Sequence, residues 1–210
     1  WQQGAVRIVV NRETTGHAAS AWNMRGTTVC DIGLQVPNAS ATVERARQLG
    51  AEVFSQAIAP GELAIPAIRG LGGSVLHFID EGSGLGKVWD VEFEAAGETT
   101  TPDVGLTRVD HLAQTMSYDE MLSWSLFYHA LFDMEKAPMV DVIDPDGIVR
   151  SQAIADPKRR LRVTLNGAET HRTLAGKFLA ETFGASVQHI ALACDDIFST
   201  AKALQATGFQ

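Results

Sequence analysis

The stretch "SVQHIALACDDIFSTAKALQATG" (Ser186 to Gly208) carries the pattern on which the fold prediction depends. Mostly apolar residues from 187 to 193 predict a strand, and the amphipathic segment after Asp196 predicts a helix that ends at Gly208. His189 lies in the middle of that strand. An unpaired buried polar group costs on the order of 1–3 kcal/mol, so this imidazole is either a hydrogen-bonded core residue or a metal ligand.

The same strand-helix pattern occurs near the start of the chain. "DIGLQVPNASATVERARQLG" (31–50) aligns with residues 189–208 at an offset of 158, and "RIVVN" (7–11) aligns with "RVTLN" (162–166) at an offset of 155. Each copy predicts a strand, a connection, a second strand and a helix closed by Gly, which suits a helix C-terminus. The sequence therefore predicts a duplicated module.

The segment between the copies adds further elements. They are expected as a strand at 106–115, a helix at 118–132, and strands at 139–143, 148–154 and 161–166. "DPDG" (Asp144 to Gly147) predicts the turn between the second and third of these strands. The order β-α-β-β-β and then β-α predicts an α+β fold of half-barrel sheets backed by helices. With a boundary expected in Glu94 to Gly105, residues 1–95 form one module, incomplete at its start, and 104–210 a second, incomplete at its end.

Composition narrows the classes of partner. The chain has 17 Lys and Arg against 25 Asp and Glu, a net charge of −8, which argues against nucleic acid or an anionic membrane as partner. No apolar run reaches the ~18 residues of a transmembrane helix. Cys30 and Cys194 suit a reducing, cytoplasmic compartment. Because the chain opens on Trp1, we expect it to be cut from a longer protein.

Two histidines are candidate metal ligands. His111 and His189 each lie on the first strand of a β-α unit, and alternation along the strands predicts small neighbours on the same faces: Val109, Ala113, Val187, Ala191 and Ala193. Two His from separate strands plus one carboxylate form the facial triad of non-haem Fe(II) enzymes. Asp31 stands where His189 stands in the other copy, so the first module is expected to bind no metal.

Other signals point to structural roles. "EGSGLGK" (81–87) has neither the Walker nor the dinucleotide spacing, and the strand-like "VWDVEF" follows it. His77 is expected to be a core or pocket-wall residue, and His17 to lie in a loop. The basic run "KRRLR" (158–162) is expected at an exposed turn and strand end.

Three motifs carry a family resemblance. "RVDHLAQT", "SQAIADPKRRLRVTLN" and "VQHIALACDDI" resemble the vicinal oxygen chelate superfamily, of glyoxalase-like fold with βαβββ modules, and within it the 4-hydroxyphenylpyruvate dioxygenase family. The resemblance implies that His111 and His189 bind the metal. The family's third ligand is a Glu in a pattern like "QIFTE". Its counterpart in the first copy is "LHFID" (76–80), so this Glu is expected near position 238, beyond Gln210.

The family's substrate contacts match three positions of this chain. The resemblance assigns substrate binding to Ser151, Asn166 and Gln188, and it identifies no catalytic residue. Two positions depart from the family: its Asn-Glu pair is Asn166-Gly167 here, and its next Gln falls near Leu174 and Ala175. These departures argue against homogentisate formation.

A closer resemblance is to the dioxygenase-like C-terminal domain of two-domain bacterial 3-dehydroshikimate dehydratases, carried by "TTVCDIGLQV", "PGELAIPAIRG", "LSWSLFYHALFDM" and "DVIDPDGIVRSQAI". It implies an N-terminal sugar-isomerase-like barrel in the whole protein, formation of protocatechuate there, and no activity for this fragment alone. The alternatives are a 4-hydroxyphenylpyruvate dioxygenase and a non-catalytic structural domain. A divalent ion is expected, Fe(II) for a dioxygenase and otherwise Mg, Mn or Co, with a keto acid or enol as substrate. A homo-oligomer is compatible with this interpretation.

Overall fold

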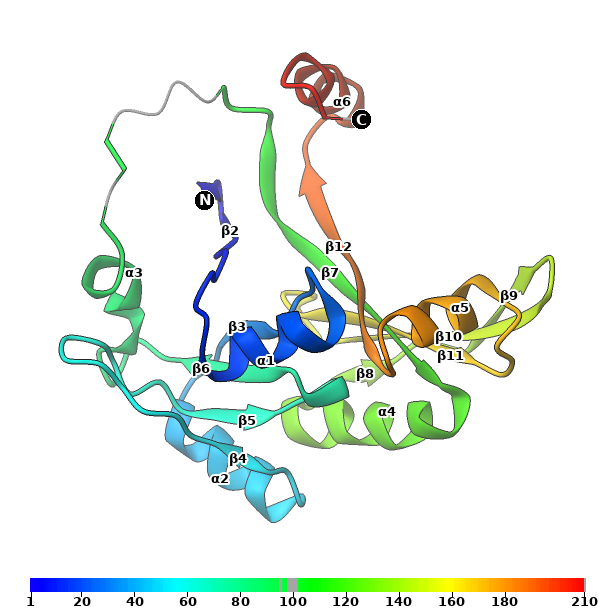
Figure 1. Ribbon diagram of the computed structural model, residues 1–210, viewed down its shortest axis with the longest axis horizontal. Coiled ribbons are helices and arrows are strands. Elements are labelled where there is room, and N and C mark those ends of the chain that lie inside the picture. The colour runs from blue at the N-terminus through cyan, green and yellow to red at the C-terminus, as the bar shows by residue number, and fades with distance from the viewer. Residues whose placement is uncertain (95, 98–101, 210) are drawn as a thin grey trace.

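The computed structural model describes residues 1–94, 96–97 and 102–209, arranged as two larger sheets and a two-stranded hairpin (Figure 1). Part of the domain boundary expected between 94 and 105 therefore lies outside the described residues. Neither larger sheet closes into a barrel within the described part of the chain. No helix there is long and apolar enough to cross a membrane.

The first half of the chain forms a four-stranded sheet in the order β3-β6-β5-β4, with β3 parallel to β6. Its elements are β3 (Asp31–Gln35), α2 (Ala39–Gln48), β4 (Val53–Phe54), β5 (Ala67–Arg69), the 3-10 turn η1 (Leu71–Gly73) and β6 (Val75–Ile79). Before and after them lie β1 (Gln2–Gln3), β2 (Val6–Arg7), α1 (Gly16–Arg25), η2 (Leu85–Lys87) and α3 (Val88–Val91). Helix α2 begins at a capping Asn38 side chain and buries Ala39 and Ala46.

The second half forms a larger sheet in the order β12-β7-β11-β10-β8, with β9 paired to β10. Its elements are β7 (Leu106–Ser117), α4 (Tyr118–Phe132), β8 (Glu135–Lys136), β9 (Val140–Asp144), β10 (Gly147–Ala155), β11 (Arg162–Ala168), α5 (Leu174–Glu181), β12 (Ser186–Cys194) and α6 (Ile197–Ala206). Strand β7 is parallel to β11, as β3 is to β6. The first half is thus a β-α-β-β-β unit, and the second has the same plan with one more short strand, β8, after the helix; in both the first strand pairs in parallel with the last.

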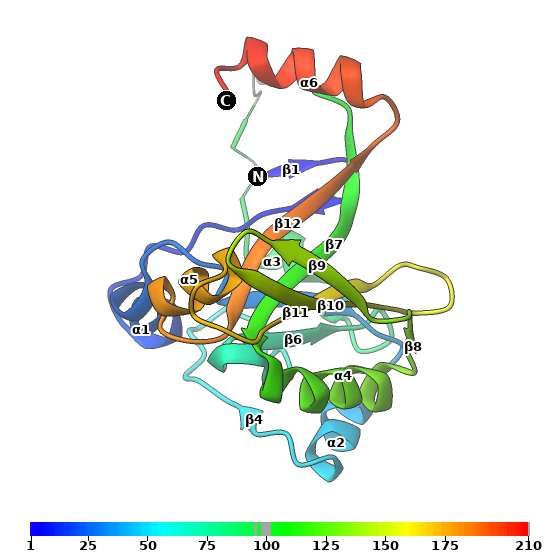
Figure 2. The same ribbon diagram turned by 90° about the vertical axis from the view of Figure 1, so that its right-hand side faces the viewer.

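Helix α4 joins the two halves through one core. A capping box of Ser117 and Glu120 starts the helix, and the buried Tyr128 donates its hydroxyl to Gln114 of the second sheet. One turn further along the helix, Phe132 contacts Phe78 of the first sheet, with ring centroids 6.1 Å apart. Helix α4 covers one face of the second sheet, and α5 covers the part of the opposite face at Val149 and Ala168, so the remainder of that opposite face is left for a site. Strands β7 and β12 extend past the other strands and carry α6 far from α4 (Figure 2).

Most predicted elements are present with nearly the expected ends. The strand around His189, the strand 106–115, the helix 118–132 and the hairpin at Asp144 to Gly147 are all confirmed. The predicted glycine ends are confirmed too, since Gly50 and Gly208 follow α2 and α6 with φ of 86° and 87°. A glycine there adopts the left-handed conformation without steric cost.

Three local predictions were wrong. Residues 7–11 do not form a strand beyond Arg7. Ile8 exchanges backbone hydrogen bonds with Trp1, but Val9 and Val10 have no neighbouring strand among the described residues to satisfy their backbone groups. "VWDVEF" is helical at α3 (Val88–Val91). His17 lies in the first turn of α1 and not in a loop.

Candidate metal site on the second sheet

Strands β7 and β12 bring His111 and His189 together. The strands are antiparallel neighbours in which His189 is paired with Ala113 and Ala191 with His111. Since side chains two apart share a face, both imidazoles lie on the face opposite α4. Their ring centroids are 5.7 Å apart in an edge-to-face arrangement. Two side chains 78 positions apart in the sequence thus form one imidazole pair.

Register shifts change which neighbours share that face. Pairing skips Gln188 between Val187 and His189, and it skips Asp110 between His111 and Val109. Each skipped residue forms a β-bulge, which interrupts alternation and re-aims side chains. The prediction that Val187 and Val109 share the face of the imidazoles was therefore wrong, because Val187 pairs with Gln114 and Val109 with Leu192. Ala113 and Ala191 do share it.

Asp110 orients His111. Its Oδ2 lies 2.8 Å from Nδ1 of His111, and the same carboxylate accepts from Arg162. A carboxylate only accepts, so Nδ1 carries the proton and the Nε2 lone pair of a neutral His111 is left free. Arg162 Nη2 also lies 3.2 Å from Nδ1, but a protonated Nδ1 cannot accept, so Asp110 is the partner of Arg162. The hydrogen bond from His111 and the charge of Arg162 hold the pKa of Asp110 below its usual value.

The surroundings of His189 favour its neutral form. Partial burial, and then the proximity of His111, lower its pKa from the ordinary value of 6.5. A neutral imidazole is the form that binds a metal. His189 can therefore present a nitrogen lone pair at neutral pH.

The three expected substrate residues lie on or beside the same sheet face. Ser151 and Asn166 are directly paired across β10 and β11, and the Ser151 hydroxyl donates to Asn166 Oδ1 at 2.8 Å. Asn166 is in turn paired with Thr115, whose buried hydroxyl has no hydrogen-bond partner among the described residues. Gln188 occupies the bulge next to His189. The structure shows no contact between the Ser151–Asn166 pair and the imidazoles.

No third ligand completes the pair within residues 1–94, 96–97 and 102–209, where no group of three His, Cys, Asp or Glu could hold one ion. Asp110 is engaged by His111 and Arg162. The Glu expected near position 238 lies outside this chain.

The carboxylates and the imidazole at the corresponding positions of the first sheet all have hydrogen-bond partners within that half of the chain. Asp31 Oδ1 lies 2.8 Å from His77 Nδ1. The buried Asp80 carboxylate accepts from the backbone N–H of Ala39 at the start of α2 and from both N–H and hydroxyl of Ser83. These hydrogen bonds lower the pKa of Asp80 and hold Oδ2 at the start of α2 and Oδ1 at Ser83.

Sequence reasoning missed Asp110 and Arg162. The basic run was expected to be exposed, but Arg162 is the first residue of β11 and only partly exposed. The available signal was the Asp that directly precedes His111 in "VDH", because a ligating His commonly donates its second N–H to a carboxylate.

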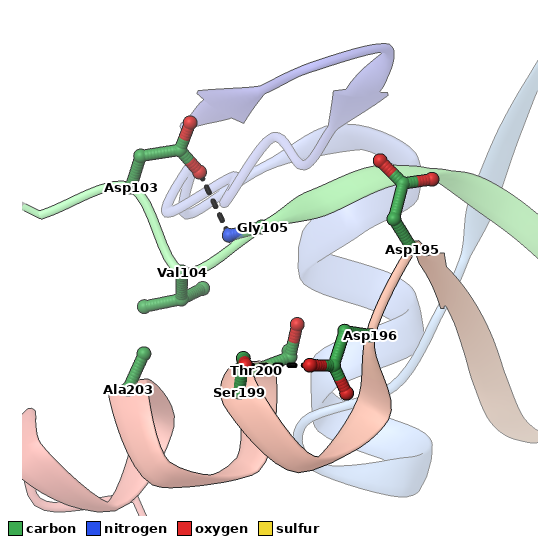
Figure 3. Close-up of a pocket in the computed structure, with 8 residues that line it drawn as sticks. All are labelled: Asp103, Val104, Gly105, Asp195, Asp196, Ser199, Thr200 and Ala203. Carbon is green, nitrogen blue, oxygen red and sulfur yellow. Dashed lines mark hydrogen bonds between the residues drawn. The ribbon is translucent and has the colours of Figure 1, made fainter.

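A separate acidic hollow of about 300 Å³ lies between α6 and the segment before β7 (Figure 3). Two of its three carboxylates have local structural roles: Asp103 accepts from the N–H of Gly105, and Asp196 caps α6 by accepting from Phe198 and Ser199. The hollow includes neither His111 nor His189.

The chain is similar to known dioxygenases and dehydratases. The family described as hydroxyphenylpyruvate dioxygenase, HPPD, N-terminal, matches residues 1–94. A 3-dehydroshikimate dehydratase of Pseudomonas aeruginosa is 33% identical over 99% of this chain and 32% of its own length. A 4-hydroxyphenylpyruvate dioxygenase of the same organism is 31% identical over 99% of this chain and 58% of its own length.

Solved structures agree on the fold. A fusion protein of a xylose isomerase-like TIM barrel with a 4-hydroxyphenylpyruvate dioxygenase matches with a TM-score of 0.77 and 31% identity, over 99% of this chain and 32% of that one. A mutant 4-hydroxymandelate synthase from Streptomyces coelicolor has a TM-score of 0.74 at 18% identity, over 91% of this chain and 56% of that one. The chain thus spans about a third to three fifths of these relatives. Residues 1–94 match the N-terminal domain of the hydroxyphenylpyruvate dioxygenase family, and the chain as a whole is similar to these relatives and has their glyoxalase-like α+β fold.

Proposed function

We propose that this chain is the dioxygenase-like metal-binding domain of a 3-dehydroshikimate dehydratase. In this proposal residues 1–95 form a module that binds no metal, and residues 104–210 form the module that binds one. The observation that carries it is the imidazole pair, two rings on one sheet face with Nδ1 of His111 bonded to Asp110. That arrangement leaves the two free imidazole nitrogens that a divalent ion requires.

The donor set fits a divalent ion. Neutral imidazoles suit Fe, Zn and similar metals, and a carboxylate from beyond Gln210 would complete a facial triad. The ion would supply Lewis acidity toward two adjacent oxygens of a keto acid or enol and, as Fe(II) in a dioxygenase, a binding position for O2. Mg, Mn and Co are the alternatives to Fe(II).

The neighbouring polar residues would orient the substrate. Because the Ser151 hydroxyl donates to Asn166 Oδ1, the amide N–H groups of Asn166 stay available as donors to a substrate oxygen. Gln188 in the bulge beside His189 would supply further polar contacts. Their role is positioning, since neither an amide nor an unactivated hydroxyl is an effective general base.

Relatives of two architectures define the first two candidates. The dehydratase and the barrel fusion are each matched over only 32% of their length, which leaves room for an N-terminal barrel as partner domain. Dioxygenase similarity supports the second candidate. Against it, a Cβ on Gly167 would lie 2.9 Å from Met121 Sδ and 3.0 Å from Tyr118, so the Glu found there in the dioxygenases would fit only if these side chains shifted. A non-catalytic structural domain is the third candidate. Two free cysteines suit a cytoplasmic location.

Elemental analysis combined with two product assays separates these candidates. The protein that carries this chain is assayed for protocatechuate from 3-dehydroshikimate and for homogentisate from 4-hydroxyphenylpyruvate, as wild type and as His189→Ala. The proposal expects protocatechuate only, with stoichiometric metal that His189→Ala removes. Homogentisate formation would establish the dioxygenase. If metal is absent from the wild type as well, the domain is structural.

A further inference from the structure

The first half contains a hollow of about 490 Å³ beside α1 that lies outside the imidazole pair. It is lined by Gly16, His17, Ser20, Ala21, Met24, Arg25, Thr28, Val29, Cys30, Phe54, Ser55, Gln56, Arg69, Gly72, Gly73 and Ser74. Two of these residues are arginines and none is Asp or Glu. In a chain with 25 acidic and 17 basic residues, this lining has the opposite charge to the molecule as a whole.

Both arginines reach the same glycine turn. Arg69 Nη1 donates to the carbonyl of Gly73 at 3.1 Å, and Arg25 Nη1 lies 3.1 Å from the position a Cβ on Gly72 would take. Gly72 and Gly73 have φ of 63° and 81°, in the region that favours glycine. Both arginines therefore lie beside this turn and line the same hollow, and the carbonyl of Ala185 also approaches Gly72.

Neither guanidinium is neutralised by a carboxylate of the described residues. Arg25 Nε is buried and has no hydrogen-bond partner among them. A buried donor without an acceptor is costly. An anion in the hollow would supply an acceptor and pair with the positive charges that line it.

The other polar groups around Arg69 leave its charge in place. His17 Nδ1 lies 3.1 Å from Arg69 Nη1, and because an arginine only donates, this nitrogen accepts. The proton is then on Nε2, which donates to the carbonyl of Cys30 at 2.9 Å. Burial and the adjacent Asp31 raise the pKa of the Cys30 thiol, so it adds no negative charge at neutral pH. His17 is thus a neutral support for a charged Arg69.

Apolar side chains complete the walls. Phe54 lies under the Arg69 guanidinium, 4.4 Å from ring centroid to Cζ, and Met24 and Val29 also line the hollow. Its volume is within the range typical of small-molecule sites. We infer that this hollow binds a small organic carboxylate, with the carboxylate between Arg25 and Arg69 and the apolar body against Met24 and Phe54.

Titration of the EDTA-treated protein with benzoate tests the site, since chelation prevents a carboxylate from binding through a metal. Benzamide is the uncharged probe of the same shape, and inorganic phosphate is the anion without an apolar body. One equivalent of benzoate should bind, and Arg25→Gln and Arg69→Gln should each weaken binding about tenfold or more, the value of a charge-assisted hydrogen bond. Benzamide should bind at least about tenfold more weakly than benzoate for the same reason.

Arg172→Gln is the matched control, because it removes one positive charge from an exposed position outside the hollow. It should leave benzoate affinity unchanged. Circular dichroism and Arg69→Lys, which keeps the charge, separate a local loss of binding from misfolding. Four results would each overturn the inference. Benzamide could bind as tightly as benzoate, or benzoate could fail to bind. Phosphate could bind where benzoate does not, or benzoate could still bind to both Gln variants.

Discussion

Strands β3 and β12 lead into equivalent helices, yet the acid-base groups on them have different partners. Asp31 at the start of β3 is bonded to His77 of the neighbouring strand, so a carboxylate and an imidazole satisfy each other. His189 on β12 faces a second imidazole, whose Nδ1 is bonded to Asp110. In both sheets a carboxylate is bonded to Nδ1 of a histidine, but only His111 lies beside a second imidazole. The second imidazole is what makes the site on β7 and β12 a candidate metal site.

The largest expected difference between the two sheets is in metal affinity. His189→Ala should weaken Co(II) binding by at least about 100-fold, because loss of a direct ligand exceeds the 10–100-fold cost of losing an outer partner. His77→Ala in the first sheet should change the affinity less than about twofold. Calorimetric titration of the protein with Co(II) measures both. Equal losses in the two variants would show that the sheets do not differ as proposed.

Asp110 should have the next largest effect. Asp110→Ala removes the acceptor of the His111 Nδ1 proton and leaves Arg162 unpaired, so Co(II) affinity should fall about 10–100-fold. Asp31→Ala is the matched control in the first sheet and should leave Co(II) affinity unchanged. An Asp110→Ala protein with wild-type affinity would mean that the orientation of His111 is fixed by packing alone.

The sequence predicted the long elements and the imidazole pair because both depend on local pattern. Apolar periodicity and turn residues define β7, α4 and β12, and the strand-helix repeat indicates where the two histidines lie. The network around Asp110 could not be predicted in the same way. It depends on bulges that skip Asp110 and Gln188, and on a contact with Arg162, 52 residues away in the sequence. Bulges and lateral strand register are set by tertiary packing.

Tyr128 tests how the two sheets are attached to α4. Its hydroxyl donates to buried Gln114 Oε1 at 2.9 Å, whereas the first sheet meets the helix through the apolar contact of Phe78 with Phe132. Tyr128→Phe should lower the free energy of unfolding by about 1–2 kcal/mol, because Gln114 Oε1 loses its donor. Tyr118→Phe is the control, since its hydroxyl has no hydrogen bond among the described residues, and should cost less than about 0.5 kcal/mol. Urea unfolding at pH 7 measures both variants.

The stability difference between the wild type and Tyr128→Phe should also depend on pH. Burial raises the pKa of Tyr128 to about 12, above the ordinary value of 10.0. Between these values the unfolded chain has lost the proton that the folded protein still holds, so stability falls as pH rises, by up to about 1.4 kcal/mol per pH unit. Tyr128→Phe lacks this component. The stability difference between wild type and variant should therefore narrow above pH 10, and a constant difference would show that the hydroxyl is not buried in solution.

The smallest expected effect concerns Ser151, which is paired with Asn166 on the second sheet. Ser151→Ala leaves Asn166 without the donor that orients its amide, so a bound keto acid should lose about one hydrogen bond of net stabilisation, roughly 3- to 10-fold in affinity. Titration of the metal-loaded protein with 4-hydroxyphenylpyruvate measures this change. Ser123→Ala is the control because Ser123 is exposed on α4, which covers the opposite face of the sheet. If both variants bind as wild type does, the Ser151–Asn166 pair serves only to join β10 to β11, and the substrate is held by the imidazole side of the sheet alone.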